Sequence, residues 1–154
     1  MSGRAKPGAE ALAAAAGAAM YGRDHAAKAL GIALAEIGPG RARTTMTVGP
    51  AMVNGHGTCH GGLIFTLADT AFAYACNSRN QASVAQHCSI TFLKPARRDD
   101  RLTADAVEQT LDGRSGVYDV RVANQKGEAV ALFRGHSRTI PGEVARSPAS
   151  KEPT

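Results

Sequence analysis

The chain has 154 residues, a formal net charge of +5 and a pI of about 9.4. Its length suits one domain with its own core, and its composition, 44% hydrophobic and 20% charged, is that of a globular protein. The positive charge suits an anionic partner. No block of five or more basic residues occurs, however, and aromatic residues are not interleaved with basic ones, so we expect no nucleic-acid partner.

The cysteines indicate a reducing compartment. Cys59, Cys76 and Cys88 make an odd number in a chain with no recognisable secretory signal, which predicts reduced, mostly buried thiols and a cytoplasmic location. The alanine-rich stretch over residues 9–19 contains Glu10 and almost no large apolar side chain. It therefore predicts a helix of a soluble protein rather than a signal peptide, and we expect no membrane partner.

The pattern of apolar residues and turn residues predicts a single α+β domain over residues 1–154, with an ordered core over about 9–140 and frayed ends at 1–7 and 142–154. A helix over 9–30, in one piece or broken near Gly22, is followed by strands and a second helix. The expected elements after it are strands at 32–37 and 41–48, a loop at 51–59, a helix at 61–77, and strands at 83–93, 101–111, 116–124 and 128–140. We expect these last four strands to form an antiparallel meander that curves around the apolar helix.

The helix over 61–77 is apolar on all sides, and Asp69 is its only carboxylic acid. Such a helix is buried, and it is shorter than the ~20 residues of a membrane span. A buried carboxylate is costly without partners, so Asp69 is either hydrogen-bonded for structural reasons or functional. The local pattern around Asp69 leaves both interpretations open.

A glycine-rich loop leads directly into this helix. Gly61 and Gly62 let another molecule approach the first turn, where unpaired N–H groups and the helix dipole favour a developing oxyanion. Eight residues separate Gly61 from Asp69, which is ~12 Å along a helix axis, so one substrate carbonyl cannot reach both in one chain. A second copy with its helix antiparallel would solve this, which predicts an active site shared across a two-fold interface.

Several segments carry a resemblance to a known family. They are Asn54-Gly55-His56, Cys59-His60-Gly61-Gly62, the run FTLADTAFAYACNS at 65–78, GVYD at 116–119 and VALFRG at 130–135. Together they closely resemble the PaaI-type thioesterases of phenylacetic acid degradation, over roughly residues 18–140. The resemblance implies a hotdog fold of about five to six strands, a homotetrameric dimer of dimers, and hydrolysis of phenylacetyl-CoA or hydroxyphenylacetyl-CoA without a cofactor.

The resemblance also implies roles for individual residues. Asp69 is the general base or the nucleophile, the Gly61 N–H polarises the thioester carbonyl, Asn54 orients water or substrate, and His60 supports the loop. The residues assigned to substrate binding are Gly62, Thr70, Lys94 and Arg97. For the basic pair, contact with CoA phosphates competes with the simpler interpretation of a solvated turn.

Alternative chemistries are less well supported by the residues. The run His56-x2-Cys59-His60 lacks the ligand spacing of structural zinc, so we expect no metal. The cysteines have no evident base to activate them as nucleophiles. Two alternatives to the thioesterase stay open: a hydratase on the same fold, and an acyl-CoA sensor that binds without catalysis.

Overall fold

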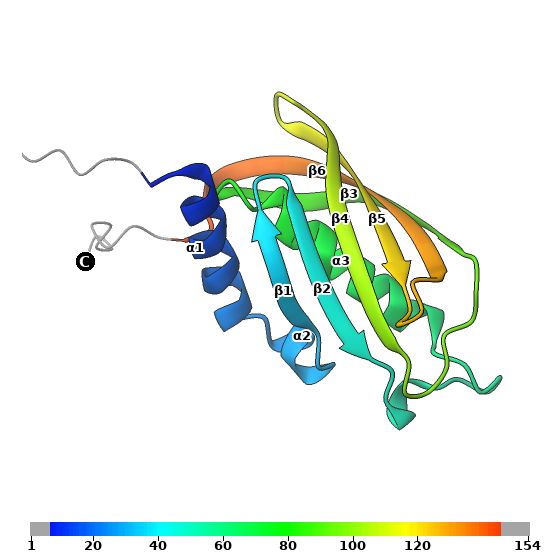
Figure 1. Ribbon diagram of the computed structural model, residues 1–154. Helices are drawn as coiled ribbons and strands as arrows, with labels where there is room; N and C mark the ends of the chain where they lie inside the picture. Colours follow the sequence, from blue (N-terminus) through cyan, green and yellow to red (C-terminus); the bar gives the residue numbers. More distant parts are fainter. Residues whose placement is uncertain (1–6, 146–154) are drawn as a thin grey trace, which may run out of the picture.

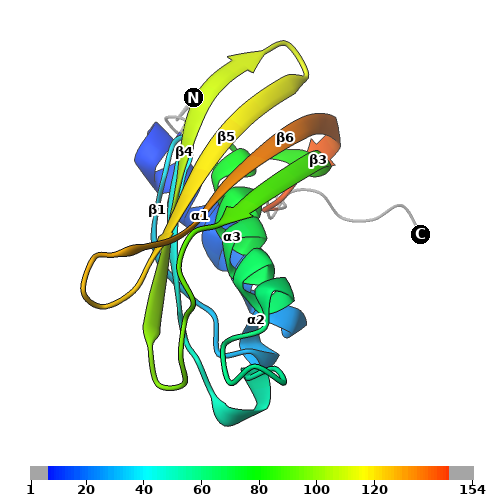
Figure 2. The same cartoon turned by 90° about the vertical axis from the view of Figure 1, so that its right-hand side faces the viewer.

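The computed structural model describes residues 7–145, and within them a curled antiparallel sheet wraps around one long helix (Figures 1 and 2). Six strands form the sheet in the order β1-β2-β4-β5-β6-β3. Their bounds are β1 Ala33–Gly38, β2 Arg41–Thr47, β3 Gln81–Phe92, β4 Arg101–Asp112, β5 Ser115–Ala123 and β6 Ala129–Glu143. The α+β class and the wrapped helix agree with the expectation from sequence.

One expectation about strand pairing is wrong. β4, β5 and β6 form a meander, but β3 does not pair with β4. It pairs with β6 at the far edge, from Gln81↔Glu143 to Phe92↔Ala131. The edge of β4 that β3 would need is occupied by β2, which pairs with β4 from Arg41↔Val107 to Thr47↔Arg101. As a result β3 is an edge strand of the sheet.

The N-terminal helix is broken near Gly22, as one of the two sequence interpretations had it. α1 spans Ala9–Gly22 and packs beside β1, and α2 spans His25–Ala29. The Asp24 side chain caps α2 by accepting a hydrogen bond of 3.0 Å from the Ala27 N–H. The other carboxylate oxygen of Asp24 accepts a hydrogen bond from the Tyr74 hydroxyl at 3.0 Å, which ties this segment to the central helix.

The central helix, α3, spans Gly61–Cys76, and its small residues let it lie close to the sheet. Phe72 packs against the rings of Tyr118 and Phe133, with centroids 5.6 and 5.9 Å apart. Gly135 lies directly beneath Phe72, since a Cβ on Gly135 would be 2.8 Å from three of its ring atoms. The close packing of these four residues fixes where α3 sits relative to β5 and β6.

α3 is not buried on all sides, contrary to the expectation from its apolar sequence. Leu67, Ala68 and Ala71 face the sheet and are fully buried, whereas Thr66, Asp69, Thr70 and Ala73 are half-buried. The neighbouring edge strand β3 carries exposed apolar side chains at Val84 (46%) and Phe92 (52%), and Leu93, which follows it, is 52% exposed. One side of α3 and the edge of β3 therefore form an apolar surface that the described chain leaves uncovered.

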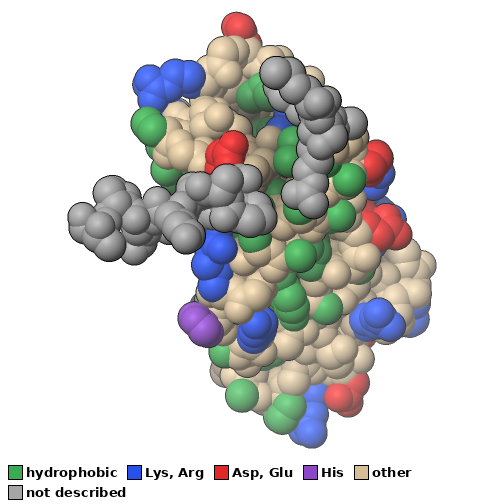
Figure 3. All heavy atoms as spheres, turned by 90° about the vertical axis from the view of Figure 1, so that its left-hand side faces the viewer, with side chains coloured by type: hydrophobic (Ala, Val, Ile, Leu, Met, Phe, Trp, Pro, Cys, Tyr) green, Lys and Arg blue, Asp and Glu red, His purple; other side chains and the backbone are tan. Residues whose placement is uncertain are grey.

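The ordered chain extends further at its C-terminus than predicted. β6 runs to Glu143, and Val144 is buried against the turn at Asn80, whose side chain accepts a hydrogen bond from the Ala145 N–H at 2.7 Å. The expected frayed ends otherwise lie outside the described residues. Within residues 7–145, no helix is long and apolar enough to cross a membrane. On the face drawn in Figure 3, charged side chains of both signs are scattered rather than gathered into one stripe.

Candidate active site

The first turn of α3 leaves one backbone donor unused. The Gly62 N–H donates to Nδ1 of His60, the N-cap residue, at 2.9 Å. The next two N–H groups, of Leu63 and Ile64, both donate to the His60 carbonyl. The Gly61 N–H makes no hydrogen bond to any atom of residues 7–145. His60 thus caps the helix start, and Gly61 presents the free donor.

Gly61 lines a cavity of about 340 Å³ between the loop and the end of β3. A Cβ on Gly61 would lie 2.9 Å from Cζ of Phe92, so a side chain here would press on the aromatic ring. The full lining is Asn54, Thr58, Cys59, Gly61, Ile64, Phe92, Leu93, Lys94, Pro95 and Ala96. The cavity therefore brings together a polar loop, a free N–H and the end of the edge strand.

Asn54 holds the loop in shape. Its Oδ1 accepts hydrogen bonds from the N–H groups of His56 (3.0 Å) and Thr58 (3.2 Å) and from the Thr58 hydroxyl (3.3 Å). Its amide nitrogen makes no hydrogen bond within the described part of the chain, and the residue lines the cavity. Asn54 can therefore order the loop through its oxygen and still offer a donor to a ligand through its nitrogen.

Asp69 lies beside Cys88 of β3 and does not line this cavity. Its carboxylate is half-buried, and the Cys88 Sγ lies 3.9 Å from Oδ1. No other side chain or backbone group among residues 7–145 hydrogen-bonds to it. Burial raises the pKa of the Asp69 carboxyl, while the contact with Cys88 lowers it to a smaller degree. An acid with so few partners is a stronger base than an ordinary surface aspartate.

The two thiols nearest this acid are protonated at neutral pH. Burial, followed by the charge of Asp69, raises the pKa of Cys76 to about 12 and that of Cys88 to about 11. Cys59, at the cavity, is buried, and burial raises its pKa as well. Thiols in this state are poor nucleophiles.

Of the remaining predicted residues, one lines the cavity, one lies outside it, and one lies next to Asp69. Lys94 lines the cavity and forms an ion pair with Glu128. Arg97 is exposed and outside the cavity lining, and its N–H donates to Asp100 at 2.8 Å. Thr70 is one residue from Asp69, with its hydroxyl donating to the Thr66 carbonyl at 2.6 Å. The structure therefore brings Asn54, Gly61 and Lys94 together and leaves Asp69 and Thr70 elsewhere.

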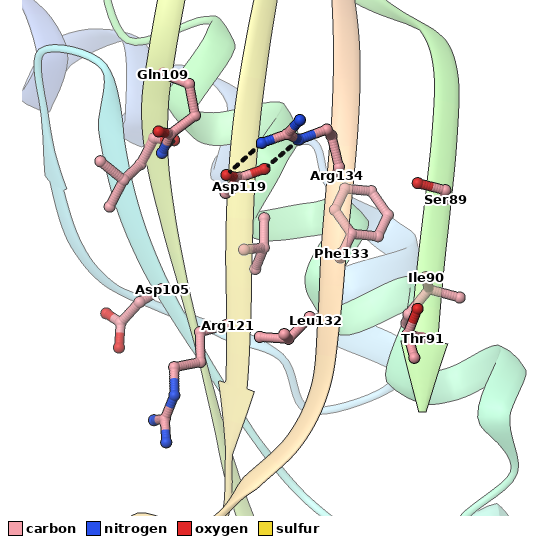
Figure 4. Close-up of a pocket in the computed structure, with 12 residues that line it drawn as sticks. Ser89, Ile90, Thr91, Asp105, Gln109, Asp119, Arg121, Leu132, Phe133 and Arg134 are labelled. Carbon is pink, nitrogen blue, oxygen red and sulfur yellow. Dashed lines mark hydrogen bonds and ion pairs between the residues drawn. The ribbon is translucent and has the colours of Figure 1, made fainter. Parts of the chain in front are cut away.

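A larger hollow, of about 690 Å³, lies on the outer face of the sheet (Figure 4). Its two carboxylates are already paired: Asp119 with Arg134 through two hydrogen bonds of 2.6 and 2.8 Å, and Asp105 with Arg43 at 2.6 Å. These pairs lower the pKa of Asp119 and raise those of the arginines. A carboxylate held in this way is a weak base, so the outer hollow is a poorer candidate for acid–base chemistry than α3.

Two residues of the site were missed by sequence reasoning. Among the aromatic side chains of α3, Phe72 and Tyr74 are core residues and Phe65 packs against Phe133. The aromatic ring at the cavity is Phe92, and the residue beside Asp69 is Cys88. Both lie on β3, each two residues from Ile90, which packs on the core. Because side chains two apart lie on one face of a strand, this spacing was the sequence signal that Cys88 and Phe92 face the core side as well.

Among residues 7–145, no group of three or more histidine, cysteine or acidic side chains is placed to hold a metal ion.

Comparison with known proteins places the chain in a family. The model of the thioesterase superfamily matches residues 56–131. The acyl-coenzyme A thioesterase PaaI of Escherichia coli is 52% identical over 126 residues, covering 82% of this chain and 90% of that protein. The solved E. coli PaaI structure, described as coming from the phenylacetic acid degradation operon, superposes with a TM-score of 0.87 at 48% identity, covering 88% and 99% of the two chains. A Streptococcus mutans protein bound to acetyl-CoA superposes with a TM-score of 0.70 at 27% identity, covering 73% and 90%. The chain thus belongs to the PaaI-type acyl-CoA thioesterases of the thioesterase superfamily and is a thioester hydrolase with the hotdog fold.

Proposed function

We propose that this protein hydrolyses aryl-acetyl-CoA thioesters, such as phenylacetyl-CoA or hydroxyphenylacetyl-CoA, to the free acid and CoA in the cytoplasm. The observation that carries the proposal is the unused Gly61 N–H, which opens into a cavity at the positive end of α3. The similarity to E. coli PaaI supports the acyl-CoA class and the aromatic pathway. The Phe92 ring beside Gly61 suits a flat acyl group.

In the proposed reaction the thioester oxygen accepts a hydrogen bond from the Gly61 N–H, which stabilises the negative charge of the tetrahedral intermediate. Asp69 either takes a proton from the attacking water or attacks the carbonyl itself to give an anhydride that water then opens. Both routes end with CoA leaving as a thiolate, which needs little help from a general acid. The absence of a second acid in contact with Asp69, within residues 7–145, is compatible with such a leaving group.

The site is proposed to be shared between two copies of the chain. Gly61 and Asp69 lie on one straight helix, eight residues or ~12 Å apart, so they cannot both reach one carbonyl. The uncovered side of α3 and the apolar edge of β3 are where a second copy fits. An antiparallel partner helix places its own Asp69 beside the first chain's Gly61.

The two-fold relation also fixes how the edge strands meet. β3 runs antiparallel to α3, because Cys88 lies beside Asp69 and Phe92 lies beside Gly61. A two-fold axis that exchanges Asp69 with the partner's Gly61 therefore sets Cys88 opposite the partner's Phe92, with Ile90 on the axis. The two β3 strands then pair antiparallel and extend the sheet across the dimer.

Mixing two inactive variants tests the shared site. Asp69→Asn and Gly61→Pro each remove one half of the site, but a dimer of one with the other retains one intact site out of two. If equal amounts exchange at random, half of the dimers are mixed, so about one quarter of the wild-type activity should return. If both groups acted within one chain, the mixture would stay inactive.

A crosslink tests the register. Directly opposed Cα atoms in an antiparallel pair are about 4.5–5.5 Å apart, which is within disulfide range. Ile90→Cys should therefore form a covalent dimer on oxidation, while the wild type, whose Cys88 faces Phe92, should not. A monomeric oxidised Ile90→Cys would contradict this register.

Assays with several substrates test the reaction. Thiol release should be fastest with phenylacetyl-CoA or hydroxyphenylacetyl-CoA, slower with benzoyl-CoA and straight-chain acyl-CoAs, and at least 100-fold slower in Asp69→Asn, within the range of about 10²–10⁴ for general-base catalysis. Tight binding of these thioesters without thiol release would instead indicate a sensor, and a change in enoyl absorbance would indicate a hydratase. Lys94→Ala and Arg97→Ala should raise KM for CoA esters if these residues contact the phosphates.

A further inference from the structure

We propose that Cys88 is a positioning residue for the reacting carboxylate: its thiol donates to Oδ1 of Asp69 and holds the side chain in one orientation. The proposal rests on the proposed function, in which Asp69 is the general base or nucleophile. The two groups come from different elements, α3 and β3, and their separation of 3.9 Å lies at the long end of hydrogen bonds from sulfur. Asp69 has no other hydrogen-bond partner in residues 7–145, so nothing else there fixes its carboxylate.

The choice of a thiol has a chemical reason. An ionised carboxylate can only accept hydrogen bonds, so it needs a donor to be held in place. A strong donor such as arginine would stabilise the anion and weaken it as a base, as the Asp119–Arg134 pair shows on the outer face. A thiol is a weak donor. It orients the acid while leaving most of the basicity that burial provides.

The thiol itself is firmly placed. Cys88 pairs across the sheet with Gly135, and Gly135 lies beneath the ring of Phe72 in the core. A shift of β3 would therefore have to disturb the packing of α3 on the sheet. The ionisable groups near Asp69 are Cys88 from β3 and Cys76 from its own helix. Cys76 donates to the Ala73 carbonyl at 3.4 Å and does not hydrogen-bond to Asp69.

The test compares three variants of the full-length protein: Cys88→Ala, Cys88→Ser and Cys76→Ala. The readouts are kcat and KM for phenylacetyl-CoA and the pH dependence of kcat/KM. Turnover is measured as the loss of thioester absorbance. Cys88→Ala should lower kcat about tenfold, as expected for one lost hydrogen bond to the reacting group, with KM changed less than twofold. Its acid limb should move to higher pH, because the lost contact lowers the pKa of Asp69.

Serine restores a donor, but its shorter reach requires the Asp69 side chain to move toward it. Cys88→Ser should therefore recover part of kcat and return the acid limb part of the way to its wild-type position. Cys76→Ala removes a thiol of the same helix without removing the contact, so its acid limb should not move. Wild-type kcat and an unmoved acid limb in Cys88→Ala would overturn the proposal. Equal losses in the serine and alanine variants, with an unmoved limb, would also overturn it, because they would show a packing role.

The failure of this inference can be told apart from failure of the proposed function. If Asp69→Asn is inactive while Cys88→Ala behaves as wild type, only the positioning role is wrong. If Asp69→Asn retains near-normal turnover, the assignment of the base is wrong and the role of Cys88 is refuted along with it.

Discussion

Replacing Gly61 by proline removes a single hydrogen atom from the site with little disturbance of the fold. Gly61 is the first residue of α3, and proline is favoured at this position because the N–H it lacks has no partner in the helix. The preceding residue, His60, has φ −58° and ψ 129°, the extended conformation that a residue before proline requires. Gly61→Pro therefore tests the N–H that makes no hydrogen bond within residues 7–145.

The expected loss is about 10²–10³ in kcat, or about 2.7–4 kcal/mol, which is typical of removing one oxyanion donor. Gly61→Ala is the matched control because it keeps the N–H. Both substitutions add a Cβ whose ideal position lies 2.9 Å from Cζ of Phe92. The steric effect of this Cβ on the Phe92 ring is common to both variants.

Thiol release from phenylacetyl-CoA gives kcat for both variants, and urea unfolding shows whether they remain folded. The ratio of the two kcat values removes the effect of the shared Cβ and leaves that of the lost N–H together with the rest of the proline ring. Equal activity of the proline and alanine variants, with both folded, would refute the role of the Gly61 N–H. The oxyanion would then have to be stabilised by another donor, and the Asn54 amide, which lines the same cavity, is a candidate.

Three further predictions concern stability. His60→Ala removes the cap of α3 and should lower the free energy of unfolding by about 0.5–2 kcal/mol, whereas His60→Asn, a good N-cap, should restore it, as followed by urea denaturation. Gly135→Ala forces a Cβ to 2.8 Å from the Phe72 ring inside the core and should cost about 1–3 kcal/mol in the same assay. Because burial raises the pKa of the Asp69 carboxyl, the folded state holds that proton more tightly than the unfolded state. The free energy of unfolding of the wild type should therefore fall relative to that of Asp69→Asn as pH rises from about 3.9, the unfolded pKa, through the folded pKa. If the difference in free energy between the two proteins stayed constant from about pH 3 to 8, the prediction would be contradicted.

The elements of the fold could be predicted from sequence because their signals are local. Gly61 and the apolar run after it place the start of α3, and the Asp112-Gly113 turn places the hairpin of β4 and β5. The position of β3 could not be predicted in this way. Its pairing with β6 depends on contacts between residues about fifty positions apart, such as Cys88↔Gly135, and nothing in either strand alone specifies the partner.

The same limit applied to the site. Gly61 and Asp69 were accessible to sequence reasoning because they lie on one helix whose spacing sets their separation. Asn54 and His60 lie in the loop before it, and their roles came from the family resemblance. Cys88 and Phe92 come from β3, and their contacts with α3 depend on how that strand crosses the helix. A one-residue shift of β3 would turn both side chains to the outer face. The sequence alone does not determine that register.

The unpaired edge of β3 and the half-exposed Asp69 carboxylate can both be explained by one partner chain. If another strand of the same chain covered β3, the exposed apolar side chains at its edge would be buried, but no Gly61 N–H would reach Asp69. If the edge stayed bare, the protein would expose an apolar strand able to pair with other chains. The proposed two-fold partner would meet both requirements, because it would cover β3 with an identical strand and bring the partner's Gly61 N–H to each Asp69. In this arrangement the interface that removes the exposed edge is also the one that completes the proposed active site, so assembly and catalysis depend on the same contacts.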